Sequence, residues 1–247
     1  MPESLPGVTG GSSVPTPAPG PAAGVFGPAL GAAREYAALL AGAGVERGLL
    51  GPREVPRLWE RHLLNCAVVA ALVPPGARVV DVGSGAGLPG VPLALARPDV
   101  EVVLVEPLLR RATFLQEVVT ALRLDRVTVV RDRAESAPVE RADVVTARAV
   151  APLERLAGWC LPLVAPGGAL LALKGERAEE ELASARVSLT AYGAVSWTVE
   201  VVGAEAVDPP TRVVRGVLAP GADPVPRPAS VRPGGGSGRR SKGRRHA

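Results

Sequence analysis

The feature that most constrains the fold of this chain is a glycine-rich turn placed directly after a short apolar strand pattern. Residues 78–82 read Arg-Val-Val-Asp-Val, and the next eight residues include Gly83, Gly85, Gly87 and Gly90. Glycine lets a backbone turn tightly and lets a ligand approach without meeting a Cβ atom. The turn therefore predicts a cofactor cradle at the end of a first strand, with a purely structural turn as the alternative.

The segments around this turn alternate between strand and helix patterns. Short apolar strands that alternate with helices predict a parallel sheet covered on both faces. Residues 195–202 and 212–218 are two strand-like runs with no helix between them, so the last strand should pair antiparallel. We predict an α/β, Rossmann-like, seven-stranded, mostly parallel sheet that ends in an antiparallel hairpin strand. The other expected strands are 78–82, 101–105, 127–130, 142–146 and 169–173, and the expected helices are 30–40, 55–72, 91–96, 108–122, 153–164 and 176–192.

Composition divides the chain into four segments. Residues 1–28 are rich in Pro, Gly and Ser and lack periodicity, which predicts disorder. Residues 29–73 carry the first two helical patterns and should form an N-terminal helical cap. The Rossmann-like domain is expected at 74–218. A basic tail rich in Pro, Gly and Arg follows at 219–247, where order should fade.

The positive charge of the chain belongs to this tail. Six of the 28 basic residues and none of the 24 acidic residues lie in residues 231–247, which leaves 22 basic residues for the rest of the chain. A polycationic tail attracts nucleic-acid phosphates without reading sequence; a solubilising extension with no partner is the alternative. Arginine dominates the basic residues, so Lys174, the only lysine before the tail, is more informative than an ordinary lysine.

Several classes of protein are disfavoured by the sequence. No apolar run is long enough to cross a bilayer, and the amino terminus lacks a signal-peptide pattern, so we expect a cytoplasmic protein. Cys66 and Cys160 lie on apolar helix patterns without metal-ligand spacing. We expect both to be reduced core thiols, and we expect no metal site.

The chemistry of the cofactor depends on how the glycine turn is interpreted. The pattern GxGxxG occurs at 85–90 and by itself equally suggests NAD. However, the Asp-x-Gly-x-Gly-x-Gly arrangement that begins at Asp81, like the hairpin ending, resembles methyltransferases that use S-adenosylmethionine, in which Asp81 would hold the amino-acid part of the cofactor. Glu106 closes the second strand, where a carboxylate accepts hydrogen bonds from ribose hydroxyls. An acid at a helix N-terminus is the alternative for Glu106.

Four motifs, in order along the chain, resemble one family. They are Arg-His-Leu-Leu at 61–64, the glycine turn with its Gly-Leu-Pro-Gly ending, Ala-Arg-Ala-Val at 147–150 and Leu-Lys-Gly at 173–175. From about Tyr36 to Leu218 the chain resembles the bacterial small-subunit ribosomal RNA guanine-N7 methyltransferases, also called glucose-inhibited division protein B. The glycine motif alone would indicate only the class I methyltransferase superfamily, and the other motifs are more selective.

The resemblance implies transfer of a methyl group from S-adenosylmethionine to N7 of a guanine in the 530 loop of 16S rRNA. The partner would be 16S rRNA or the small ribosomal subunit, and a monomer is expected. In related methyltransferases the loop after the third strand, here residues 132–135, lies against the adenine of the cofactor; a solvated turn is the alternative. The glycine turn, Asp81 and Glu106 discussed above, together with the residues at the family's motif positions, form the expected cofactor site. Its residues are Asp81, Gly83, Gly85, Gly87, Leu88, Glu106, Ala134, Glu135 and Arg148.

Methylation at this atom needs alignment rather than a strong base. Guanine N7 has an in-plane lone pair and loses no proton when it attacks, and alignment alone can lower a barrier by about 7–11 kcal/mol at best. Arg148 and Lys174 end two strands beside the expected cleft and are the candidate catalytic residues, which would hold RNA phosphate or the guanine edge. A salt-bridge role for Arg148 and a surface role for Lys174 are the alternatives. His62 is interpreted as a packed residue on an apolar helix face.

Three other functions stay open from sequence. The first is a methyltransferase of the same fold that acts on a small molecule or a protein. The second is an NAD-dependent oxidoreductase built on the GxGxxG pattern. The third is a non-catalytic RNA-binding protein in which the basic tail does the binding.

Overall fold

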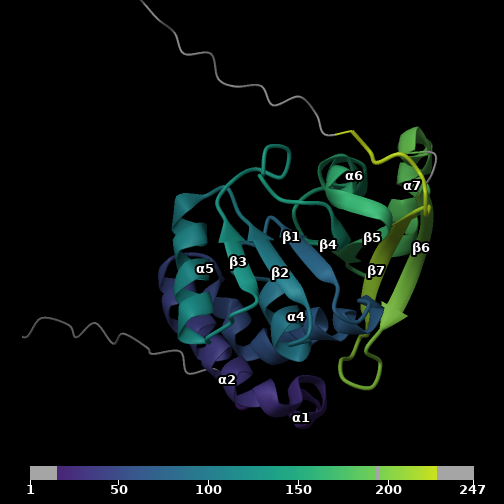
Figure 1. Cartoon of the computed structure of the whole chain (residues 1–247). Coiled ribbons are helices and arrows are strands. Elements are labelled where there is room, and N and C mark those ends of the chain that lie inside the picture. Colours follow the sequence, from purple (N-terminus) through teal and green to yellow (C-terminus); the bar gives the residue numbers. More distant parts are fainter. Residues whose placement is uncertain (1–15, 193–194, 227–247) are drawn as a thin grey trace, which may run out of the picture.

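The computed structural model describes residues 16–192 and 195–226 and has one seven-stranded sheet at its centre (Figure 1). The strand order is β3-β2-β1-β4-β5-β7-β6, and β7 alone runs against the others, because it pairs antiparallel with both β5 and β6. The predicted α/β sheet with an antiparallel hairpin is thus confirmed. The strands are β1 (Arg78–Val82), β2 (Glu101–Val105), β3 (Val127–Val130), β4 (Ala142–Arg148), β5 (Val164–Lys174), β6 (Val195–Val202) and β7 (Thr211–Leu218).

Helices cover both faces of the sheet. Because successive strand residues point to opposite faces, Val79 packs into the cluster that holds α4 (Gly90–Ala96) and α5 (Leu109–Ala121). Its neighbour Val80 packs into the cluster of α6 (Leu153–Cys160) and α7 (Ala178–Leu189) on the other face. In Figure 1, α6 and α7 lie at the upper right, α5 lies at the left and α4 low in the centre, and the N-terminal helices α1 and α2 lie below them.

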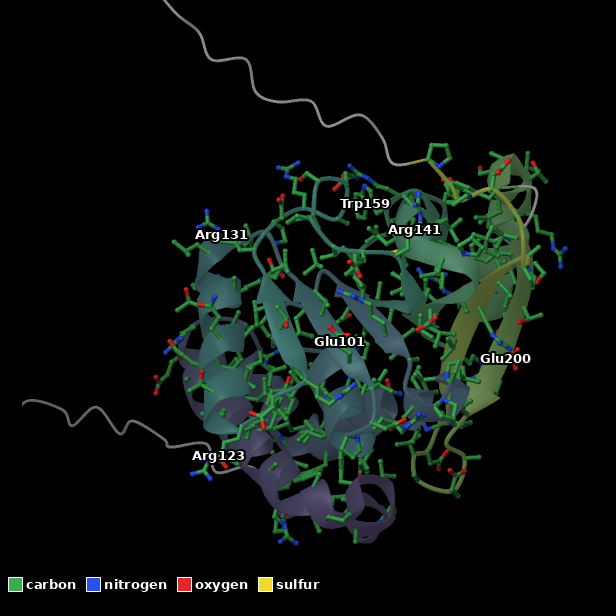
Figure 2. The ribbon with its side chains drawn as sticks, viewed as in Figure 1. Glu101, Arg123, Arg131, Arg141, Trp159 and Glu200 are labelled. Carbon is green, nitrogen blue, oxygen red and sulfur yellow. The ribbon has the colours of Figure 1, made fainter. Side chains whose placement is uncertain are left out.

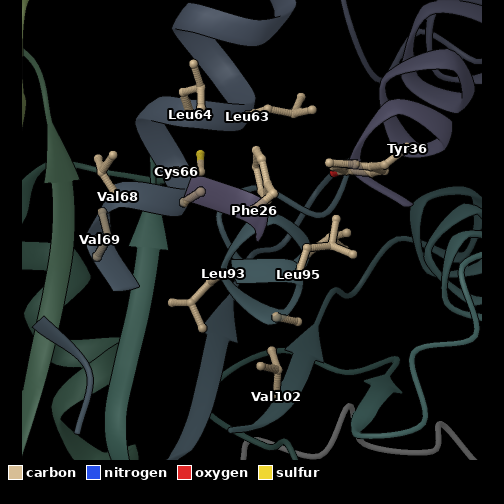
Figure 3. Packing of buried hydrophobic residues seen from close by; sticks show 14 of the residues in the cluster. Phe26, Tyr36, Leu63, Leu64, Cys66, Val68, Val69, Leu93, Leu95 and Val102 are labelled. Carbon is tan, nitrogen blue, oxygen red and sulfur yellow. The ribbon is translucent and has the colours of Figure 1, made fainter. Parts of the chain in front are cut away.

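The N-terminal segment forms a helical cap over the face that carries α4 and α5. Buried side chains of the cap, among them Tyr36, Leu63 and Cys66, join the same hydrophobic cluster as Leu93 of α4 and Val102 of β2 (Figure 3). The cap therefore continues the core of the sheet domain. Its helices are α1 (Gly20–Phe26), α2 (Leu30–Leu39) and α3 (Asn65–Ala67), with 3-10 turns at Gly27–Ala29, Pro52–Arg57 and Val68–Leu72 and π-helical turns at Leu40–Gly44 and Leu58–Leu64.

The prediction of disorder for residues 1–28 is wrong for α1. Ala22 and Phe26, four residues apart, are buried, and the Phe26 ring meets Trp59 edge-on with centroids 6.3 Å apart. A seven-residue helix has little stability of its own, so this one depends on tertiary packing that composition does not reveal. Residues 1–15 and most of the basic tail, 227–247, lie outside the described residues.

Other predicted elements differ in extent. Four strands, β1, β2, β3 and β6, begin and end at the predicted residues. β5 is longer than predicted and starts at Val164, because Pro166, Gly167 and Gly168, which favour a turn, lie within a strand that pairs with β4 across a register shift. The expected helix at 55–72 is helical but passes through 3-10, π and α segments, with Pro56 inside the first of them.

The strand order places a topological switch point between β1 and β4. From β1 the chain moves outward to β2 and β3 and then returns to add β4 and β5 on the other side. Ligands of open α/β sheets bind beyond the carboxyl ends of the strands at such a point. The glycine turn follows β1 and Arg148 ends β4, so the fold places both at this position.

Charged side chains are spread over several edges of the domain. In Figure 2, Arg131 lies at the upper left of the domain, Arg123 at the lower left and Glu200 at the right. Arg123 precedes β3 and Arg131 follows it, so these two arginines lie at opposite ends of one strand. The abundance of arginine therefore does not by itself mark one nucleic-acid surface. Among the described residues, no helix is long and apolar enough to cross a membrane.

We predict that Gly168→Ala lowers the free energy of unfolding by about 1–3 kcal/mol or more, because an added Cβ would lie 2.7 Å from the Asp143 carbonyl oxygen, where only backbone can give way. The measurement is urea unfolding followed by circular dichroism. Gly175→Ala is the matched control, because a Cβ at Gly175 meets nothing within 4 Å. Equal stability of the two variants would contradict the packing assigned to this strand.

Candidate functional site

The glycine turn is held against the end of β2 by its own backbone. The Gly83 and Ser84 N–H groups both donate to the Val105 carbonyl, at 2.9 and 3.2 Å. Gly83, Gly85 and Gly87 have φ values of +69°, +59° and +100°, a region that favours glycine. At Gly87 a Cβ would also lie 2.7 Å from a methyl group of Val91. Both the backbone conformation and the space around the turn therefore require glycine.

Asp81 lies beneath this turn rather than on its open side. Its side chain is fully buried, and its Oδ2 accepts the Gly90 N–H at 3.1 Å. Its Oδ1 accepts the Thr146 hydroxyl of β4 at 3.3 Å. Burial raises the pKa of Asp81 from 3.8 to about 6. The structure does not bring Asp81 to the cavity described next, so its geometry indicates that it positions the turn, not that it touches the cofactor.

A cavity of about 550 Å³ opens beside the turn, within the size range of small-molecule sites. Glu106 lies on its wall, and its carboxylate accepts the Gly85 N–H at 3.0 Å and the Leu108 N–H at 2.9 Å. The two bonds fix its orientation and leave lone pairs for a ligand. The lining residues are Leu49, Leu50, His62, Gly83, Ser84, Gly85, Ala86, Leu88, Glu106, Pro107, Leu108, Arg111, Arg148, Ala149 and Val150.

The helical cap reaches the turn through Tyr36 of α2. The Tyr36 hydroxyl donates to the Ala86 carbonyl at 2.8 Å, and the ring is fully buried. Burial raises the pKa of Tyr36 well above 10, so the hydroxyl keeps its proton and remains a donor. A helix from outside the Rossmann-like core thus fixes the middle of the glycine turn.

The cap also holds Arg148, which ends β4 at the cavity. Arg148 donates through Nη1 to Cys66 Sγ at 2.9 Å, and through Nη2 to the Arg61 carbonyl at 3.2 Å and to His62 Nδ1 at 2.7 Å. The other ring nitrogen of His62 lies 2.8 Å from Glu54 Oε2. Arg148 is therefore bound to three residues of the cap while it lines the cavity.

Lys174 lies at the end of β5 on a second cavity, of about 610 Å³. Its Nζ donates to Glu181 Oε1 at 2.6 Å and to the Ala151 carbonyl at 3.2 Å, and its side chain is 11% exposed. This cavity shares Ala149 and Val150 with the first one. The two candidate catalytic residues thus belong to adjacent cavities and not to one.

Of the remaining predicted site residues, Gly83, Gly85, Leu88 and Glu106 line the first cavity. Gly87 is in the same turn but faces Val91 and Tyr36. Ala134 and Glu135 lie in the loop after β3 and are not among the residues that line the cavity. Within the described part of the chain, no group of His, Cys, Asp and Glu side chains suits a metal ion.

Sequence reasoning did not find Glu54, Tyr36 and Cys66 as parts of the site. Tyr36 is 50 residues from its partner Ala86, and Cys66 is 82 residues from Arg148. Leu49, Leu50 and Val150 on the cavity wall were missed as well. The one signal in the sequence was the motif at 61–64, which lies close to Cys66 along the chain. The other contacts join residues that are far apart in sequence, and such contacts are decided by packing.

Comparison with known proteins places these features in a family. The family model described as "rRNA small subunit methyltransferase G" matches residues 30–208. Proteins named Ribosomal RNA small subunit methyltransferase G are similar to the chain: one from Mycolicibacterium gilvum is 59% identical over 85% of this chain and 94% of its own length. Another, from Streptomyces avermitilis, is 61% identical over 81% of this chain and 84% of its own length.

Solved structures agree on the fold. A methyltransferase from Aquifex aeolicus that depends on S-adenosylmethionine has a TM-score of 0.50 and 17% identity, covering 66% of this chain and 94% of its own. The pyocyanin biosynthetic protein PhzM has a TM-score of 0.52 and 16% identity, covering 74% of this chain and 61% of its own. At such identities the likeness concerns architecture alone.

We predict that Asp81→Asn removes a pH dependence of stability. Because the folded pKa of Asp81 is raised, the unfolded chain releases this proton first, so the contribution of Asp81 to stability falls as pH rises from about 4 to about 6 and is then constant. The asparagine variant should gain about 3 kcal/mol relative to wild type across this window, an order-of-magnitude figure for two pKa units. Urea unfolding at pH 4, 5, 6 and 7 measures it.

Asn keeps an acceptor for the Gly90 N–H, so Asp81→Asn should leave the turn intact, whereas Asp81→Ala leaves that buried donor without a partner. A difference between wild type and Asp81→Asn that does not change with pH would contradict the buried, ionisable state assigned to Asp81.

Proposed function

The chain belongs to the rRNA small subunit methyltransferase G family, whose members use S-adenosylmethionine, and we propose that it methylates N7 of a guanine in the 530 loop of 16S rRNA. The observation that carries the proposal is the cavity at the β1–β4 switch point, bounded by the glycine turn, Glu106 and Arg148. Family membership excludes the NAD-dependent oxidoreductase that the GxGxxG pattern alone allowed, and it disfavours a small-molecule or protein substrate and a purely RNA-binding role.

The residues of the first cavity suit the cofactor. Bound S-adenosylmethionine supplies a methyl group on a sulfonium, which is an electrophile. Glu106, oriented by two backbone N–H groups, would accept hydrogen bonds from ribose hydroxyls. Gly83, Gly85 and Leu88 would let the cofactor lie against the backbone of the turn. By resemblance, Ala134 and Glu135 of the loop after β3 would contact the adenine, although neither is among the residues that line the cavity.

The acceptor base would occupy the second cavity. It adjoins the first across Ala149 and Val150, so a base there lies next to the cofactor. Lys174 on its wall would hold RNA phosphate or the guanine edge, with its position fixed by Glu181. Arg148 has three donors engaged by the cap, which favours a role in holding the cofactor side of the reaction over contact with the base.

This reaction needs no side chain that accepts a proton, and the residues at the site offer none in a suitable state. Both ring nitrogens of His62 are occupied, by Arg148 and Glu54. Burial raises the pKa of the Cys66 thiol, so it is a poor nucleophile. The site therefore works through alignment of N7 with the methyl group and tolerance of the cationic product.

The proposal includes a cytoplasmic monomer that acts on 16S rRNA or on the small subunit. Its direct test maps 7-methylguanosine by borohydride and aniline cleavage of rRNA from a strain that lacks this gene. The cleavage in the 530 loop should disappear and return with a plasmid copy. A 530-loop signal that survives the deletion would show that another enzyme makes this modification.

We predict that Lys174→Ala retains cofactor binding, measured by calorimetry, and loses methyl transfer by about a hundredfold, because misplacement of a reacting group by about 1 Å has a cost of that size. Glu181→Gln is the control for the ion pair: it removes the charged partner of Lys174 and keeps the cation. Unchanged turnover in Lys174→Ala would remove Lys174 from the mechanism, and equal losses in both variants would indicate a structural ion pair.

A further inference from the structure

A chain of hydrogen-bonding side chains runs from the surface of the cap to the cofactor cavity. It begins at Glu54, passes through both ring nitrogens of His62 and ends on the guanidinium of Arg148, with contacts of 2.8 and 2.7 Å. Glu54 belongs to the 3-10 turn Pro52–Arg57, His62 to the π-helical turn Leu58–Leu64, and Arg148 to β4. The chain therefore joins two layers of the fold at the cavity wall.

The contacts determine the protonation state of His62. Arginine has only donors, so His62 Nδ1 must accept from Arg148, and the single proton of a neutral ring is then on Nε2, which donates to the Glu54 carboxylate. A protonated ring would have no acceptor for Arg148 and would place two cations 2.7 Å apart. Only the neutral Nε2–H tautomer satisfies both contacts.

The charges around His62 support this state. The groups that face it are Glu54, Arg61 and Arg148, with the Cys66 thiol on the far side of the guanidinium. Burial of the ring, which is 7% exposed, and the charge of Arg148 lower the pKa of His62 below 6.5, against the opposing effect of Glu54. Although burial acts to raise it, the His62 hydrogen bond and the charge of Arg61 lower the pKa of Glu54, so Glu54 stays an acceptor.

Arg148 has donors to spare for a ligand. Three of its five N–H groups are used by Cys66, Arg61 and His62, and the side chain lines the cavity beside Gly83 and Glu106. If His62 ceased to accept, the guanidinium would lose its shortest contact and would be repelled by the ring. Its remaining donors would then no longer be fixed at the cavity.

We propose that His62 is a positioning residue for the cofactor site: held by Glu54 in its neutral Nε2–H form, it accepts from Arg148 and keeps that guanidinium directed at S-adenosylmethionine. The affinity of the enzyme for its cofactor is then controlled by the protonation of a cap histidine that does not itself need to touch the cofactor. The inference rests on the cofactor site and is independent of which RNA base is methylated.

The test is calorimetric titration of the full chain with S-adenosylmethionine from pH 5.5 to pH 8. His62→Leu, which removes the acceptor and keeps the bulk, should weaken binding roughly tenfold at pH 7.5, the size expected for loss of a hydrogen bond to a charged group. His62→Asn offers an amide oxygen near the place of Nδ1 and should restore most of the affinity. Glu60→Ala, at an exposed position of the same turn, is the matched control and should bind as wild type does.

The pH profile separates positioning from a merely structural role. Because the pKa of His62 is lowered, wild-type affinity should fall only at the acidic end of the range, at a lower pH than an ordinary histidine would give. His62→Asn, which does not titrate, should not show this fall. Because Asp81 also titrates near pH 6, both proteins are compared in an Asp81→Asn background. Thermal melts at each pH confirm that the proteins are folded.

Three results would overturn the proposal. His62→Leu could bind as tightly as wild type, His62→Asn could be as weak as His62→Leu, or the acid loss could persist in His62→Asn. If His62→Leu does not fold, the asparagine variant and the pH profile still decide the outcome. Complete absence of cofactor binding by the wild type would instead contradict the assignment of the cofactor site, so the two failures are distinguishable.

Discussion

The carboxylate of Asp81 is the contact on which the rest of the site depends. It is buried at the end of the central strand and bonds both to the first amide of α4 and to the hydroxyl of Thr146 on β4. One side chain thus ties together β1, the helix after the glycine turn and the strand across the switch point. Burying an acid is costly without such partners, and its raised pKa records that cost. The glycine turn keeps its shape because the buried Asp81 carboxylate beneath it has hydrogen-bond partners.

The cap completes what the Rossmann-like core begins. Tyr36 fixes the carbonyl of Ala86 in the turn, and the segment from Arg61 to Cys66 fixes Arg148. The cap helices share one hydrophobic cluster with α4 and β2, so these polar contacts are held by a continuous core (Figure 3). The cavity proposed for the cofactor is therefore built jointly by two parts of the chain that lie far apart in sequence.

The two cavities are separated by a short strained link. Ala149 has a φ of +53°, which costs a non-glycine residue about 1–2 kcal/mol. Val150 packs over Gly83, and a Cβ atom added at Gly83 would lie 3.0 Å from a methyl group of Val150. Both residues line both cavities. Ala149 thus lies in a strained conformation between the two cavities that are proposed to hold the cofactor and the acceptor base, and backbone strain of this kind is concentrated at functional sites.

The sequence by itself determined the order of strands and helices, the hairpin ending and the place of the glycine turn, because these depend on local periodicity and on the conformational freedom of glycine. It also indicated Glu106, which follows β2, and Arg148, which ends β4, and both line the first cavity. Only the tertiary structure decided that Asp81 is buried under the turn, that Lys174 faces a second cavity, that Gly20–Phe26 is helical and that Glu54, His62 and Cys66 support Arg148. These outcomes rest on contacts between residues separated by tens of positions, and their free energy comes from packing and desolvation, which no local pattern encodes.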